Sequence, residues 1–96
     1  MQRVSFSQES AVKRAKQDLA HRLSVTESDI QLVSVAEKDF PNGVLGVPVN
    51  GEMAMQMISS GWQIDLKADG QNYEYRADKY QIRLRDFKGQ NYIIES

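Results

Sequence analysis

The chain of 96 residues contains no cysteine, which excludes disulfide bonds, thiolate metal ligands and thiol catalysis. With a single histidine, it cannot build a histidine-rich metal site. A formal net charge of -1 provides no overall field that would favour nucleic acid or an anionic membrane. What is left is a small domain of ordinary composition, with 41% hydrophobic and 26% charged residues.

Long apolar runs are also missing. No run approaches the roughly 20 residues that a membrane-spanning helix needs, so we expect no membrane span. The first ten residues, MQRVSFSQES, lack the apolar core of a signal peptide, so we expect none in the chain as given. None of these features fixes the compartment, because a domain without disulfides is viable in any of them.

A helix is predicted over about residues 8–23. Ser7 can cap its first turn, and Glu9 lies near the positive end of the helix dipole. Apolar residues then recur at spacings of three and four, which places them on one stripe of the helix. The stripe consists of Val12, Ala15, Leu19 and Leu23.

The second half of the chain predicts an antiparallel meander. Its three runs of alternating apolar residues are separated by turns that contain Asp69 and Asp78. The predicted strands are at about 62–68, 71–77 and 80–86.

Three other segments are candidates for the same sheet. Residues 30–37, IQLVSVAE, are apolar on both faces, which is typical of an interior strand or of a strand whose second face is partly covered. Residues 53–59 and 91–95 are candidates for extra strands, with a short helix as the alternative for the first of them. Gly61 is expected to form a bulge or kink where the meander begins.

The register of the meander follows from its turns. With Asp69–Gly70 as a two-residue turn, Leu66 lies opposite Tyr73, and Ile64 opposite Tyr75. With Asp78–Lys79 as the second turn, the opposed pairs become Tyr75 with Ile82 and Tyr73 with Leu84. Both rows are apolar or aromatic, whereas a slip of one residue would turn a whole strand inside out. A longer second turn is the alternative, because Asp78–Lys79 lacks the glycine that a tight turn prefers.

The helix and the sheet each have one apolar surface, and packing them together buries both. We therefore predict a single α+β domain over residues 1–96. One N-terminal helix is expected to pack across a curled antiparallel sheet of about four strands.

Several short segments carry a resemblance to a known family. In chain order they are AVKRAKQDLAHRLSV, DIQLVSV, LGVP, GWQIDL and YEYRAD, within about residues 11–78. Their pattern (a DLAxRL helix, an LGxP loop, and GxxIxL and YxY strands) resembles a family of uncharacterised small bacterial domains. That family is often found in secreted proteins and lipoproteins, and its general shape is similar to PepSY and cystatin-like domains. The resemblance implies a location outside the cytoplasm if a leader has been removed.

The chain departs from the family pattern at four positions. Phe40 replaces a tryptophan, Val47 a cysteine, Trp62 a tyrosine and Arg76 a histidine. Because the cysteine and histidine are the only chemically reactive residues of the pattern, their replacement argues against catalysis or metal binding through them. By analogy of fold alone, the resemblance suggests a role in controlling proteases. Cystatins inhibit proteases, and PepSY domains are thought to inhibit or chaperone them.

Single residues offer weak signals for chemistry. His21 has only Asp18 nearby on the helix, so we interpret it as a surface or boundary residue. Asp65 and Glu74 are predicted to lie side by side across the outer face with Arg83, as a solvated row of charges. We predict no catalytic residues and no cofactor, because no nucleophile, base and orienting group converge.

Two larger sets of residues are candidate binding sites. The thioethers of Met53, Met55 and Met57 could bind Cu(I) if they shared one face of a strand, but methionine more often packs or contacts partners. A basic and aromatic surface for single-stranded nucleic acid is countered by the acidic residues interleaved with it. Its members would be Trp62, Lys67, Arg76, Tyr80, Arg83 and Arg85. We therefore predict neither a metal site nor a nucleic-acid site.

The segment 39–51, DFPNGVLGVPVNG, is the strongest functional candidate. It contains both prolines of the chain and three of its six glycines, together with several apolar residues. A stiff apolar loop loses little entropy on binding, so we predict a contact site for another protein. The predicted contact residues are Phe40, Val44, Leu45, Val47, Val49, Trp62 and Arg76. The alternative is that Leu45 and Val47 cap the core.

The function that follows is a non-enzymatic protein-binding or accessory domain that uses residues 40–50 or a sheet edge. A protease inhibitor of cystatin- or PepSY-like type is the alternative, with the same loop entering a protease cleft. An enzyme is the third hypothesis and the least supported. The sequence does not set the oligomeric state or the identity of the partner.

Overall fold

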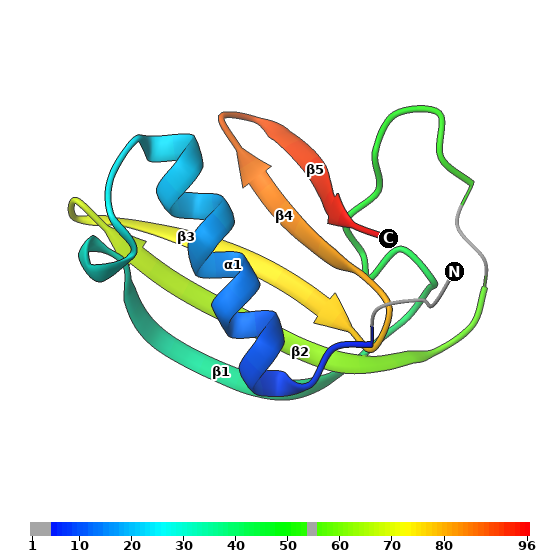
Figure 1. The fold of residues 1–96 in the computed structure, drawn as a ribbon. Coiled ribbons are helices and arrows are strands. Elements are labelled where there is room, and N and C mark those ends of the chain that lie inside the picture. Colours follow the sequence, from blue (N-terminus) through cyan, green and yellow to red (C-terminus); the bar gives the residue numbers. More distant parts are fainter. Residues whose placement is uncertain (1–4, 54–55) are drawn as a thin grey trace.

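One helix lies across one face of a five-stranded antiparallel sheet in the computed structural model, which describes residues 5–53 and 56–96 (Figure 1). Each strand pairs with the next one along the chain, in the order β1-β2-β3-β4-β5. A short 3-10 helix, η1, connects the α-helix to the sheet. The elements are α1 (Gln8–Leu23), η1 (Glu27–Asp29), β1 (Gln31–Phe40), β2 (Ser59–Ala68), β3 (Gln71–Asp78), β4 (Ile82–Phe87) and β5 (Gln90–Glu95). The predicted α+β architecture is confirmed, with five strands instead of about four.

Helix α1 begins at a reciprocal serine cap. The Ser7 hydroxyl accepts from the Ser10 backbone N–H at 3.2 Å, and the Ser10 hydroxyl accepts from the Ser7 N–H at 2.9 Å. Ser24 ends the helix in the left-handed conformation, with φ 56°. These caps define the two ends of α1.

The main core lies between α1 and the sheet. Ala11 and Ala15 are fully buried, and their small side chains let the helix approach the strands closely. Larger side chains fill the rest of this core, among them Leu19, Ile64, Leu66, Tyr75, Ile82 and Leu84.

The first hairpin has the predicted register, whereas the prediction for the second was wrong. Leu66 lies opposite Tyr73, as expected, but Tyr75 lies opposite Leu84 instead of Ile82. The reason is the turn, because the Asp78 carboxylate accepts from the backbone N–H groups of Tyr80 and Gln81 at 2.8 and 3.0 Å. The strands are therefore shifted by two residues, which leaves every side chain on its predicted face.

Two other expectations about the sheet need correction, and a third is confirmed. Strand β1 lies at an edge of the sheet, not in its interior. Residues 53 and 56–58 belong to no strand, and residues 54–55, which include Met55, lie outside the described residues. The predicted extra strand at 91–95 does form, as β5.

Gly61 forms no bulge, because it pairs regularly with both Lys38 and Asp78. A Cβ atom at this position would lie only 2.0 Å from the Ala77 carbonyl oxygen. The position therefore requires glycine because the neighbouring backbone is so close. The irregularity of the sheet lies instead in β1, between Leu32 and Ser34.

None of the helices in the described part of the chain is long and apolar enough to cross a membrane.

Candidate functional site

The apolar side chains of the 40–50 segment are buried, which corrects the prediction that they form an exposed contact site. Phe40 is 1% exposed and Val44 is 5% exposed, while Leu45 and Val47 are fully buried. None of the four belongs to the core beneath α1. These four buried residues, which we call the second core, lie apart from it, so the alternative that Leu45 and Val47 cap the core beneath α1 is not confirmed either.

Partner contact was also predicted for Val49, Trp62 and Arg76, and the structure leaves these only half-buried. Trp62 packs against the core beneath α1. The Arg76 guanidinium lies 5.5 Å from the centre of the Phe40 ring, on the opposite face of the sheet. The seven predicted contact residues therefore lie on two faces of the sheet, and four of them are buried inside the protein.

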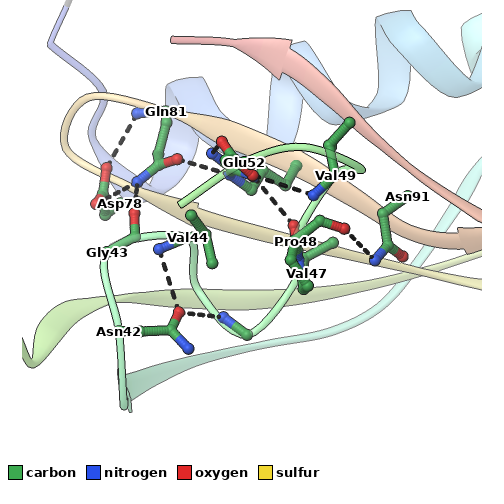
Figure 2. Close-up of polar contacts among 12 residues, drawn as sticks. Asn42, Gly43, Val44, Val47, Pro48, Val49, Glu52, Asp78, Gln81 and Asn91 are labelled. Atoms are coloured by element: carbon green, nitrogen blue, oxygen red, sulfur yellow. Dashed lines mark hydrogen bonds and ion pairs between the residues drawn. The ribbon is translucent and has the colours of Figure 1, made fainter. Parts of the chain in front are cut away.

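Three side chains of the sheet and one of the turn before β4 hold the segment 41–52, which we call the latch loop, against the face turned away from α1. Each donates a hydrogen bond to a backbone carbonyl of the loop, and Figure 2 shows several of these contacts. The pairs are Gln81 to Gly43 at 2.8 Å, Arg76 to Leu45 at 2.9 Å, Arg83 to Val47 at 3.0 Å and Asn91 to Pro48 at 2.8 Å. These bonds satisfy loop carbonyls that regular secondary structure does not pair.

The latch loop is also tied to itself. The Asn42 side-chain oxygen accepts from the backbone N–H groups of Val44 and Gly46, at 3.1 and 2.9 Å (Figure 2). Leu45 and Gly46 both have positive φ, of 58° and 69°. A Cβ atom at Gly46 would lie 2.7 Å from the end of the flexible Arg76 side chain, which can shift, so it is the positive φ that favours glycine there.

Arg83 and Glu52 form the strongest polar contact of the loop. The guanidinium meets the carboxylate through two N–O contacts of 2.5 Å, and Arg83 is only 4% exposed. The hydrogen bond from Arg83 holds the pKa of Glu52 below its usual value. The sequence analysis had paired Arg83 with Glu74, but the shifted second hairpin places Arg85 opposite Glu74.

Among the acid–base candidates, the carboxylates of Asp18 and Asp65 form hydrogen bonds within the fold. Asp18 accepts hydrogen bonds from the Tyr75 hydroxyl and from Arg22, both at 2.7 Å, while His21 points outward on the helix. Asp65 accepts from Ser34 at 2.9 Å. Across the described residues, no group of three or more His, Asp or Glu side chains is arranged to hold a metal ion.

The two methionines among the described residues lie in exposed positions. Met53 is 92% exposed and Met57 is 51% exposed, and the neighbouring Ile58 is 73% exposed. Met57 and Ile58 lie immediately before β2 and line a shallow hollow with Pro41 and Asn42. Exposed apolar side chains that lie together can contact a partner.

The free side of β1 is the longest open feature of the sheet. Eight of its ten side chains are exposed, and Val33 is the most exposed apolar one, at 53%. Apart from its pairing with β2, none of the backbone hydrogen bonds found in residues 5–53 and 56–96 involves β1. On the opposite edge, side chains of β5 contact other elements: Asn91 donates to the latch loop, and Glu95 forms an ion pair of 2.8 Å with Arg14. Figure 1 shows β1 along the border of the sheet.

Comparison with known proteins gives one match. A family model described as a domain of unknown function, DUF8738, matches residues 12–85, which include most of α1, the latch loop and strands β1 to β3. Searches of curated proteins and of solved structures found no match.

Proposed function

The chain belongs to the DUF8738 family of domains of unknown function, and we propose that it is a non-enzymatic protein-binding domain whose β1 edge pairs with an extended segment of a partner protein. The observation that carries the proposal is the open side of the ten-residue strand β1, with Val33 exposed beside it. An edge strand presents unpaired N–H and C=O groups, which are a template for a further strand.

The side chains of β1 indicate which segments would fit. Leu32 and Val33, near the start of the strand, are 37% and 53% exposed and favour apolar residues in the partner. Glu37 and Asp39, near its end, lie on the same face of the sheet as Trp62 and favour a basic residue. The irregular pairing at Val33 and the charges near the end also hinder indiscriminate pairing of the edge.

A non-enzymatic role is supported by the way the ionisable groups are used. Asp18 fixes Tyr75 and Arg22, and Glu52 fixes Arg83. These contacts stabilise the fold and engage Asp18 and Glu52, so that neither is a free acid or base.

The test is a selection of random linear peptides on the immobilised protein, followed by binding measurements on two variants. Val33→Lys places a charge on the β1 edge, and Ile93→Lys places the same charge on β5, where Ile93 is 41% exposed. We expect selected peptides to lose at least tenfold in affinity for the first variant and to keep their affinity for the second. Equal effects of the two variants, or a selection that yields no peptide sensitive to Val33→Lys, would contradict the proposal.

Protease inhibition of the cystatin- or PepSY-like type is the second candidate. In the loop predicted to enter the protease cleft, residues 40–50, most of the apolar side chains are buried: Phe40, Val44, Leu45 and Val47. The exposed residues Met57 and Ile58 beside it are the better candidates for entering a cleft. The wild-type chain and an Ile58→Asp variant can be compared on a panel of cysteine, serine and metalloproteases. Inhibition that the variant loses would support this function, and no inhibition by the wild-type chain would eliminate it.

A further inference from the structure

The latch loop contains two Asn-Gly pairs, Asn42–Gly43 and Asn50–Gly51. In such a pair the backbone nitrogen of the glycine can attack the side-chain amide carbon of the asparagine. A five-membered succinimide forms and ammonia leaves. Water then opens the ring to aspartate or to isoaspartate, in which the chain continues through the side-chain carbon. Glycine favours the attack because it has no side chain to obstruct the ring and its backbone is free to adopt the required conformation.

The fold restrains the first pair. The Asn42 side-chain oxygen is held by the N–H groups of Val44 and Gly46, and the residue is only half-exposed. The Gly43 carbonyl accepts from Gln81 at 2.8 Å. The amide carbon of Asn42 can reach the Gly43 nitrogen only after these bonds open, which makes the reaction depend on local unfolding.

The second pair is accessible. Asn50 and Gly51 are both exposed and occupy the two central positions of a turn, which is closed by a 3.0 Å bond from the Glu52 N–H to the Val49 carbonyl. A Cβ atom at Gly51 would meet nothing within 4 Å, so the space around the pair is open. Among the described residues, no hydrogen bond restrains the Asn50 side chain.

We propose that Asn50 is a site of spontaneous deamidation, with isoaspartate as its main product, and that the fold protects Asn42 from the same reaction. The inference is independent of the β1 edge and of any partner.

Isoaspartate at position 50 has a structural consequence. Its linkage adds one carbon to the main chain inside the turn that ends at Glu52. Glu52 also accepts from the Val49 N–H at 3.0 Å, so its carboxylate is positioned by this turn before it meets Arg83. A longer turn displaces the carboxylate and leaves the buried Arg83 guanidinium without its acid. The modification therefore releases the latch loop.

The experiment is incubation of the full chain at mildly alkaline pH, with peptide mapping by mass spectrometry and enzymatic methylation of isoaspartate. In the folded protein we expect product at residue 50 to form at least about tenfold faster than at residue 42. In urea the two pairs should react at similar rates, because their local sequences are alike. Equal rates in the folded protein, or a faster reaction at Asn42, would overturn the proposal.

The consequence is tested with two purified forms. The isoaspartate form should unfold at a lower urea concentration than the wild-type chain. An Asn50→Asp variant, which adds the same charge without lengthening the main chain, should unfold at nearly the wild-type concentration. If both forms unfold together, the inferred release of the loop is wrong.

Discussion

Glu52 and Arg83 stand 31 positions apart in the chain and meet through two N–O contacts of 2.5 Å. The same guanidinium donates to the Val47 carbonyl and, through Nε, to the Gln81 side chain. This one side chain of β4 therefore contacts the middle of the latch loop, its last residue and the turn before β4. Because Arg83 is 4% exposed, its charge depends on these partners for compensation.

Removal of the Glu52 carboxylate should destabilise the protein strongly. A Glu52→Ala variant leaves a buried guanidinium without its acid, for which we expect a loss of about 3–5 kcal/mol in the free energy of unfolding. The matched control is Glu95→Ala, which removes the acid of an exposed pair with Arg14 and should cost less than about 1 kcal/mol. Urea unfolding followed by circular dichroism measures both. Similar losses in the two variants would show that the Glu52 pair is no stronger than a surface contact.

The Glu52–Arg83 pair should also contribute stability that depends on pH. The pKa of Glu52 is lowered in the folded state from the ordinary 4.5, first of all by its hydrogen bond to Arg83. The unfolded chain therefore takes up the proton more readily, so the contribution is present above pH 4.5 and is lost as the pH falls below it. The difference in unfolding free energy between the wild type and Glu52→Gln should shrink over that range. A constant difference would mean that Glu52 does not titrate with folding.

The elements that the sequence predicted well are those whose signals are local. The apolar period of three and four and the Ser7 cap define α1, and the Asp69–Gly70 turn fixes the first hairpin. The predicted register of the second hairpin was wrong by two residues, because Asp78 and Lys79 are not the two central residues of the turn. The Asp78 side chain instead organises a turn centred on Lys79 and Tyr80. A shift by two residues changes the pairs but not the faces, so the pattern of apolar residues could not reveal it.

The latch loop could not be predicted for a different reason. Val44 and Leu45 are apolar whether they meet a partner or the sheet of their own chain, and the sequence does not distinguish the two cases. The contacts that decide it, from Arg76, Gln81, Arg83 and Asn91, come from residues that are distant in the chain. A Leu45→Asp variant, which would test an exposed contact site, would instead bury a charge in the second core.

Gly61 should not tolerate a side chain. A Cβ atom there would lie 2.0 Å from the Ala77 carbonyl oxygen, which belongs to the backbone of β3 and cannot move without disturbing the sheet. We expect Gly61→Ala to lower the free energy of unfolding by about 1–3 kcal/mol or more. Ser60→Ala, at the exposed neighbouring position in β2, is the control: it removes only an exposed hydrogen bond to Asp39 and should cost about 1 kcal/mol or less. A Gly61→Ala variant as stable as this control would show that the two strands can separate at no cost.

Tyr75 joins the core to α1 through a single polar bond. Its ring is fully buried, and its hydroxyl donates to Asp18 at 2.7 Å. Burial and the neighbouring carboxylate both raise the pKa of Tyr75 far above its ordinary 10.0. Folding therefore opposes loss of this proton, and the stability contributed by Tyr75 is present below pH 10 and falls as the pH rises above it.

A Tyr75→Phe variant tests this account in two ways. It removes a hydrogen bond to a charged acceptor, so we expect a loss of about 1.5–3 kcal/mol in the free energy of unfolding near neutral pH. In an alkaline titration followed by tyrosinate absorbance, the wild type and the variant should give the same amplitude while folded, because Tyr75 keeps its proton. The amplitude of the wild type should exceed that of the variant only once the chain unfolds. A difference of one tyrosinate in the folded state would show that the Tyr75 hydroxyl is open to solvent.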